Sequence, residues 1–171
     1  MIKRYRELIG LPILELRTGE NIAKVQDVIL NAQERRVLAL VVERGGLFKT
    51  ARAILFERVE GIGDNAVTVE TANVIVELPQ HPDLERLYKR GIHLQGNRLV
   101  TKSGNRLGKI VDFGLETETG EIVLLYLTSG LLKGQTSVNA QKIITVGKDA
   151  VIVPDDYAAE PEETTEGEEP S

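Results

Sequence analysis

The sequence predicts an all-β protein built from two small β-barrels in tandem, joined by a short helix and followed by an acidic tail. Three observations carry this prediction: an internal repeat, short apolar segments separated by glycine turns, and a single segment with helical periodicity. Together they divide the 171 residues into a first unit at 1–78, a linker helix at 79–90, a second unit at 91–153 and a disordered tail at 154–171.

The internal repeat is the strongest of these signals. Three residues in the first half recur 85 positions later, pairing Gly19 with Gly104, Lys24 with Lys109 and Asp27 with Asp112. Each copy continues through a polar turn into an apolar run, and residues 63–69 are matched by residues 147–153 after the loss of one position. The repeat indicates one folding unit present twice, and units of this size are only marginally stable alone.

Short strands are expected throughout both units. Pro12 restricts the first of them to an edge or to a strand start. The runs at 37–42 and 122–127 are apolar at every position, which predicts strands buried on both faces and in need of a cover. In the first unit we expect strands at 8–16, 22–30, 37–42, 53–56 and 65–70, and the second unit repeats this order.

One segment, residues 82–90, has the pattern of an amphipathic helix. Pro82 suits the first turn, and Leu84, Leu87 and Tyr88 fall on one face. Acidic residues occupy the start of this segment and basic residues its end, which matches the helix dipole. We expect this helix to pack the two units together.

Charge is unevenly distributed along the chain. Residues 154–171 carry eight acidic groups and no basic group, a composition typical of disorder, and the remaining body has 21 basic against 18 acidic residues. We expect removal of this tail to leave the melting temperature unchanged. The chain contains no cysteine, signal-peptide pattern or apolar run of membrane-spanning length, so we expect a cytoplasmic protein.

Motifs of catalysis or cofactor binding are weak. Residues 61–66 fit a dinucleotide glycine pattern but lead into a strand, and the glycines before Lys109 are too closely spaced for a phosphate loop. His81 and His93 stand apart from other metal-ligating residues. The sequence therefore predicts no enzyme activity, no cofactor and no metal site.

Asp27 and Asp112 are the acidic residues that both copies share. One reading makes them proton-handling or partner-docking carboxylates. The favoured reading makes them acceptors for backbone amides near a turn, worth about 1 kcal/mol each.

Two equivalent loops, residues 45–49 and 130–134, place apolar side chains between glycine and lysine. They could form a contact surface, or Leu47 and Leu132 could plug the ends of the barrels. Arg52 belongs to a neighbouring basic cluster with Arg35, Arg36, Arg44 and Lys49. The candidate partner-binding residues are Leu47, Phe48, Arg52, Leu131, Leu132 and Lys133.

The repeated pattern, which in the second copy comprises Gly104, Leu107, Gly108, Lys109, Ile110 and Asp112, resembles the PRC-barrel family. The first copy departs from it with Ala23 in place of the second glycine. The family includes the cytoplasmic domain of the photosynthetic reaction-centre H subunit and the carboxy-terminal domain of a ribosome-maturation factor.

The resemblance implies a barrel fold and docking onto a larger assembly. We therefore expect a non-enzymatic adaptor that binds an unidentified protein, on a cytoplasmic or membrane-associated assembly. The alternative is a ribosome- or RNA-associated maturation factor, and self-association with a second copy is left open.

Overall fold

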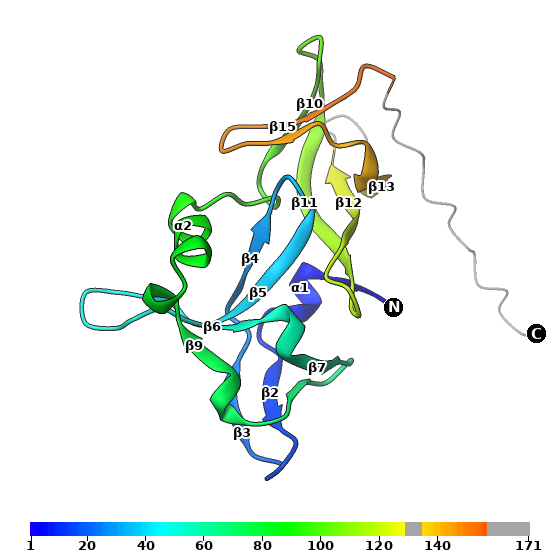
Figure 1. The fold of residues 1–171 in the computed structure, drawn as a ribbon. Coiled ribbons are helices and arrows are strands. Elements are labelled where there is room, and N and C mark those ends of the chain that lie inside the picture. The colour runs from blue at the N-terminus through cyan, green and yellow to red at the C-terminus, as the bar shows by residue number, and fades with distance from the viewer. Residues whose placement is uncertain (129–134, 157–171) are drawn as a thin grey trace, which may run out of the picture.

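The computed structural model describes residues 1–128 and 135–156 (Figure 1). These residues are mostly β-strand, as predicted. Leu131, Leu132 and Lys133, three of the candidate binding residues, lie outside the described residues, as does the tail from residue 157 onward.

The first unit contains two four-stranded sheets. One has the order β3-β2-β8-β7, and the other has the order β4-β5-β6-β9. The chain passes between them at Val25 and Gln26, where the Val25 amide donates to the carbonyl of Leu11, just before β2, and the Gln26 amide donates to the carbonyl of Val41 in β5. The strands are β2 (Pro12–Glu15), β3 (Asn21–Lys24), β4 (Asp27–Asn31), β5 (Arg36–Glu43), β6 (Arg52–Leu55), β7 (Val59–Ile62), β8 (Val67–Val69) and β9 (Ile75–Glu77).

The second unit forms one sheet with the order β13-β12-β11-β10-β15-β14, and β1 (Ile2–Arg4) adds to it by pairing with β11. Its long strand β11 (Arg106–Glu116) takes the place of β3 and β4 together. The other strands are β10 (Arg98–Thr101), β12 (Ile122–Thr128), β13 (Gln135–Asn139), β14 (Thr145–Val146) and β15 (Val151–Val153).

The prediction of barrels was wrong in one respect, because the described sheets are not closed. In the second unit β13 and β14 end the sheet path without pairing to each other. The 3₁₀ turn η4 (Ala140–Lys142) separates them, and the two residues of β14 pair only with β15 among the described strands. In the first unit the break at Val25 and Gln26 divides the strands between two sheets. Both units are therefore bent, open β-structures.

The strand pairings of residues 12–69 recur in the same order at residues 98–153. In each unit the first strand pairs in parallel with the last, through Ile13 and Val67 in one and Leu99 and Val151 in the other. In each unit a long central strand, β5 or β12, pairs antiparallel on both sides. Equivalent positions in the two units can therefore be compared directly.

Burial of the two central strands agrees with the sequence prediction, since Leu40 and Leu125 are both 0 % exposed. Ala39 and Val41, on the opposite face of β5, pack in a second cluster with Leu84 of α2 (Pro82–Arg90). The helix is therefore present where it was predicted, and it supplies the cover that β5 needs (Figure 1).

Contact between the units is made elsewhere. The turn before β12 lies against the turn before β5, where the Val37 amide donates to the Gly120 carbonyl and the Ile122 amide donates to the Arg35 carbonyl, both at 2.8 Å. Gly120 has φ +76°, and a Cβ there would lie 2.8 Å from the Val37 oxygen. One apolar cluster runs through both units, including Leu40, Ile54, Phe113 and Leu125.

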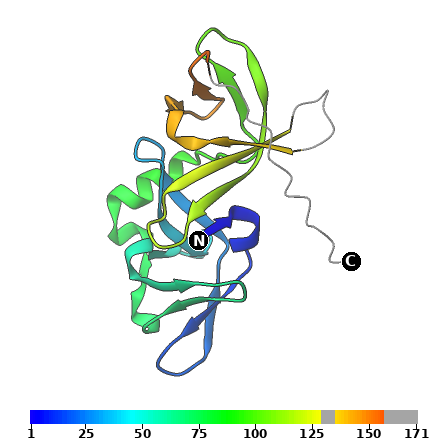
Figure 2. The same cartoon turned by 90° about the vertical axis from the view of Figure 1, so that its right-hand side faces the viewer.

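The amino-terminal segment also lies at the contact between the two units, which is called the joint below. After β1 comes the four-residue helix α1 (Tyr5–Leu8), whose last residue falls within the strand expected at 8–16. Figure 2 shows this segment between the two units, beside β11 and β12. The remaining short helical turns are η1 (Phe56–Arg58), η2 (Ala72–Val74) and η3 (Leu78–Gln80).

Candidate interaction surfaces

Asp112 is an acidic side chain in the joint between the units. It is 1 % exposed, and its Oδ2 lies 3.2 Å from Nε of Arg4 and 3.4 Å from Nε of Arg6. Its Oδ1 accepts hydrogen bonds from the amides of Phe113 at 2.9 Å and Arg6 at 3.3 Å. The Arg4 guanidinium also stacks 3.6 Å above the Tyr126 ring. The carboxylate therefore anchors the amino-terminal segment to the second unit.

Asp27, its equivalent in the first unit, binds the same amino-terminal segment through Tyr5. Its Oδ1 accepts from the Tyr5 hydroxyl and from the Val28 amide, both at 2.8 Å, and Arg44 lies 3.6 Å from its Oδ2. The Tyr5 ring stacks on Phe113 at a centroid distance of 5.1 Å. Both aspartates accept a backbone amide, as the favoured reading expected, but the amide belongs to the next residue of a strand and not to a turn. Both also bind the segment around α1.

Tyr5 gives a pH-dependent prediction. Burial, and the hydrogen bond to Asp27, raise the pKa of Tyr5 well above the usual phenol value of about 10. Because the folded pKa is above the unfolded one, this contribution to stability is complete below about pH 10 and is lost as the pH rises further. We expect urea unfolding to show a steeper loss of stability above pH 10 in the wild type than in Tyr5→Phe. Parallel losses in the two proteins would contradict this assignment.

The loop between β5 and β6 presents two apolar side chains to solvent. Leu47 is 97 % exposed and Phe48 is 99 % exposed. The base of the loop is held by a hydrogen bond from the Gly46 amide to the Lys49 carbonyl, and by the ion pair of Lys49 with Glu43 at 3.4 Å. Leu47 therefore does not plug a barrel end, and the contact surface stays a prediction for this loop.

Arg52 lies at the base of the same loop. It begins β6 in register with Glu43 on one side and Glu77 on the other, and these residues line a small surface hollow with Lys49. Arg52 is therefore at the base of the loop whose tip carries Leu47 and Phe48.

Two other arginines of the basic cluster, Arg36 and Arg44, are engaged within the protein. Arg44 donates to the Gln26 carbonyl at 2.9 Å and lies beside Asp27, and Arg36 donates to the Thr119 carbonyl at 3.1 Å. These contacts remove part of the argument for an RNA-binding face there.

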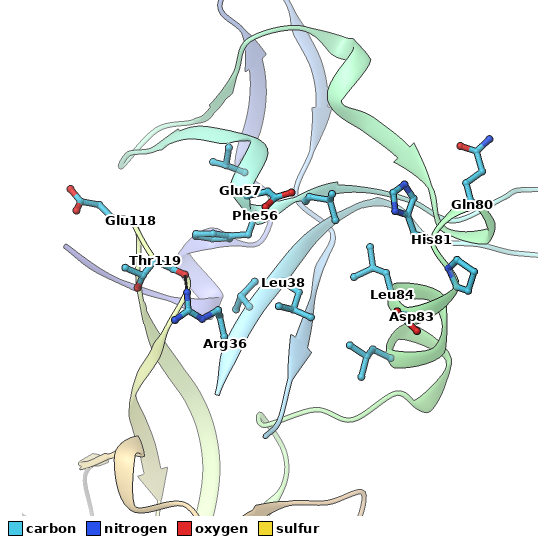
Figure 3. Close-up of a pocket in the computed structure, with 15 residues that line it drawn as sticks. Arg36, Leu38, Phe56, Glu57, Gln80, His81, Asp83, Leu84, Glu118 and Thr119 are labelled. Atoms are coloured by element: carbon cyan, nitrogen blue, oxygen red, sulfur yellow. Dashed lines mark hydrogen bonds between the residues drawn. The ribbon is translucent and has the colours of Figure 1, made fainter. Parts of the chain in front are cut away.

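A groove of about 770 Å³ lies where α2 and β5 meet the turn before β12 (Figure 3). Its apolar lining comes from the first unit and from α2 and includes Leu38, Leu55 and Leu84. Figure 3 shows Leu38 between Leu84 and the hydrogen bond that joins Arg36 to Thr119. Because Glu118 and Thr119 of the second unit also line it, the complete groove needs both units. The sequence reading missed it.

Polar groups around this groove include His81 and Asp83 at the start of α2 and Glu57 of η1. In the part of the chain that the structure describes, no three His, Cys, Asp or Glu residues are grouped as a metal site would require. No helix of the described residues is long and apolar enough to span a membrane.

The start of the acidic tail is fixed to the second unit. Asp155 accepts hydrogen bonds from both the amide and the hydroxyl of Ser103, and these bonds lower its pKa. The Lys102 amide donates to the Val153 carbonyl at 2.8 Å. A truncation that leaves the fold intact should therefore follow Asp156 rather than Val153.

The arrangement defines a small all-β protein with two open units and an exposed apolar loop. Residues 1–79 match the family model of the PRC-barrel domain. No curated protein matches the chain. The match agrees with the family resemblance seen in the repeated motif.

Proposed function

We propose that this chain is a non-enzymatic, cytoplasmic docking module formed by two tandem PRC-barrel-like units. The observation that carries the proposal is the nearly complete exposure of Leu47 and Phe48 at the tip of a loop whose base is held in place. Interface energy is concentrated in a few apolar or aromatic anchors, each worth about 2 kcal/mol or more. A partner surface with an apolar pocket would bury both side chains.

The test is quantitative affinity capture with the double variant Leu47→Ala/Phe48→Ala. We expect the partner bound by the wild type to be lost, and the melting temperature to be unchanged because neither side chain is buried in the fold. The matched control is Leu16→Ala, which removes a half-exposed leucine from the turn after β2, outside the loop of Leu47 and Phe48. Equal capture by the double variant and the control would overturn the loop as the docking site.

The alternative function, association with ribosomes or RNA, has a different signature. Phosphate contacts make affinity fall steeply with salt concentration, whereas capture by apolar anchors is much less sensitive. A gel shift with structured RNA at several salt concentrations therefore separates the two. Salt-sensitive RNA binding that survives Leu47→Ala/Phe48→Ala would favour the alternative.

A further inference from the structure

The second unit has a basic hollow that no sequence motif marks. Four cationic side chains line it, together with Asn97, His93 and Asp149, and its volume is about 560 Å³. Within residues 1–128 and 135–156, none of the four cations forms an ion pair with a carboxylate. These four residues, here called the basic hollow, are Arg98, Arg106, Lys109 and Lys148.

Two of these cations, Arg98 and Lys109, lie opposite each other in a way that lowers the stability of the sheet. Arg98 and Lys109 are direct partners across the β10–β11 ladder. Like charges directly opposite each other on neighbouring strands destabilise a sheet. Among the described residues, Asp149 is the one carboxylate in the lining, so the hollow has a net positive charge.

The first unit shows that the fold does not require this charge. The partner of Lys24, the equivalent of Lys109, is Pro12. The positions that correspond to Arg106 and Lys148 are Asn21 and Asp64, the latter paired with Lys3 at 3.5 Å. At these four positions the first unit therefore has one cation and one carboxylate, whereas the second unit has four cations.

The hollow is firmly built and lies close to the origin of the acidic tail. The Asn97 side chain is buried and donates to the carbonyls of His93 and Gly147, which ties β10 to the turn before β15. Because β10 and β15 are parallel neighbours, Arg98 at the start of β10 is about 10 Å along the sheet from Thr101, the partner of Val153. Asp155, two residues further, is held on Ser103.

We propose that residues 157–171 bind in the basic hollow of their own chain. This segment contains six glutamates and no basic residue, so its charge complements the four cations. Its fifteen residues can extend about 50 Å, several times the distance required. A short tether also gives an effective concentration in the millimolar range, so weak carboxylate contacts suffice.

The absence of cysteine allows a direct test in the full chain. Thr164→Cys provides a unique attachment point for a nitroxide spin label. At low ionic strength we expect paramagnetic loss of NMR signal at the amides of Asn97, Arg98, Lys109 and Gly147. The signals should return in high salt, which screens exposed charges.

Two charge variants make the result specific. Arg98→Gln/Lys109→Gln should abolish the signal loss, while the control Lys24→Gln/Arg58→Gln, with the same charge change on exposed residues of the first unit, should preserve it. Absence of signal loss at low salt, or equal loss in both variants, would overturn the proposal. Equal RNA affinity of the full chain and of a chain ending at Asp156, lost in Arg98→Gln/Lys109→Gln, would assign the hollow to phosphates and also overturn it.

Discussion

Leu40→Asp and Leu125→Asp are each expected to destabilise the protein by several kcal/mol, enough to leave much of it unfolded. Both leucines are fully buried in the cluster shared by the two units, on strands with neighbours on both sides. An aspartate there would place a charge in an apolar environment with no partner. Denaturant unfolding of purified variants, or their loss from the soluble fraction, measures the effect.

The control is Leu47→Asp, which introduces the same charge on an exposed leucine and should leave stability within about 0.5 kcal/mol of the wild type. If Leu40→Asp were equally mild, the central strand would not be enclosed as described. Because the cluster is continuous, we expect either substitution to unfold both units in a single transition.

Asp112→Ala is expected to cost about 3–5 kcal/mol, the scale for removing one partner from a buried ion pair. The substitution leaves the Arg4 guanidinium in a largely buried position without its carboxylate, and it removes the acceptor of the Phe113 and Arg6 amides. This exceeds the value of about 1 kcal/mol expected for a simple turn hydrogen bond. Asp112→Asn, which keeps the shape, should fall between the two.

Asp27→Ala is the matched control because it removes the equivalent carboxylate from the more exposed site. We expect a loss of about 1–2 kcal/mol, the cost of the hydrogen bonds from Tyr5 and Val28. The double variant Arg4→Met/Asp112→Leu should recover much of the stability lost in Asp112→Ala, since apolar replacement of a buried pair is often neutral. Equal losses for the two aspartates would show that Asp112 has no special role in the joint.

The sequence predicted the local elements well. The apolar runs predicted the buried central strands, and the pattern around Leu84 predicted the helix that covers one of them. These features depend on residues close together in the sequence. For Leu47 and Phe48 the flanking glycines and Lys49 marked the loop, but the sequence left open whether its apolar residues are exposed or plug a barrel end.

Features formed by distant residues were missed. The helix was expected between the units, but the units instead meet through the two turns around Val37 and Gly120 and through the amino-terminal segment. Arg4 and Arg6 of that segment bind Asp112, more than 100 positions along the chain. The open sheets depend on which strands fail to pair, and strand periodicity does not report that. The basic hollow combines residues from 98 to 148, and only a comparison of the two repeats position by position could have revealed it.

Because β1 pairs with β11 of the second unit, the first strand to be synthesised cannot pair until most of the chain has been made. Arg6 and Asp112 are 106 positions apart, so at about 5–20 residues per second the segment is made roughly 5–20 seconds before its partner strand. Until then Arg4 and Arg6 of the nascent first unit have no Asp112 carboxylate to pair with. The closing of this long loop is therefore a late event in folding, and contacts of such separation slow folding in general.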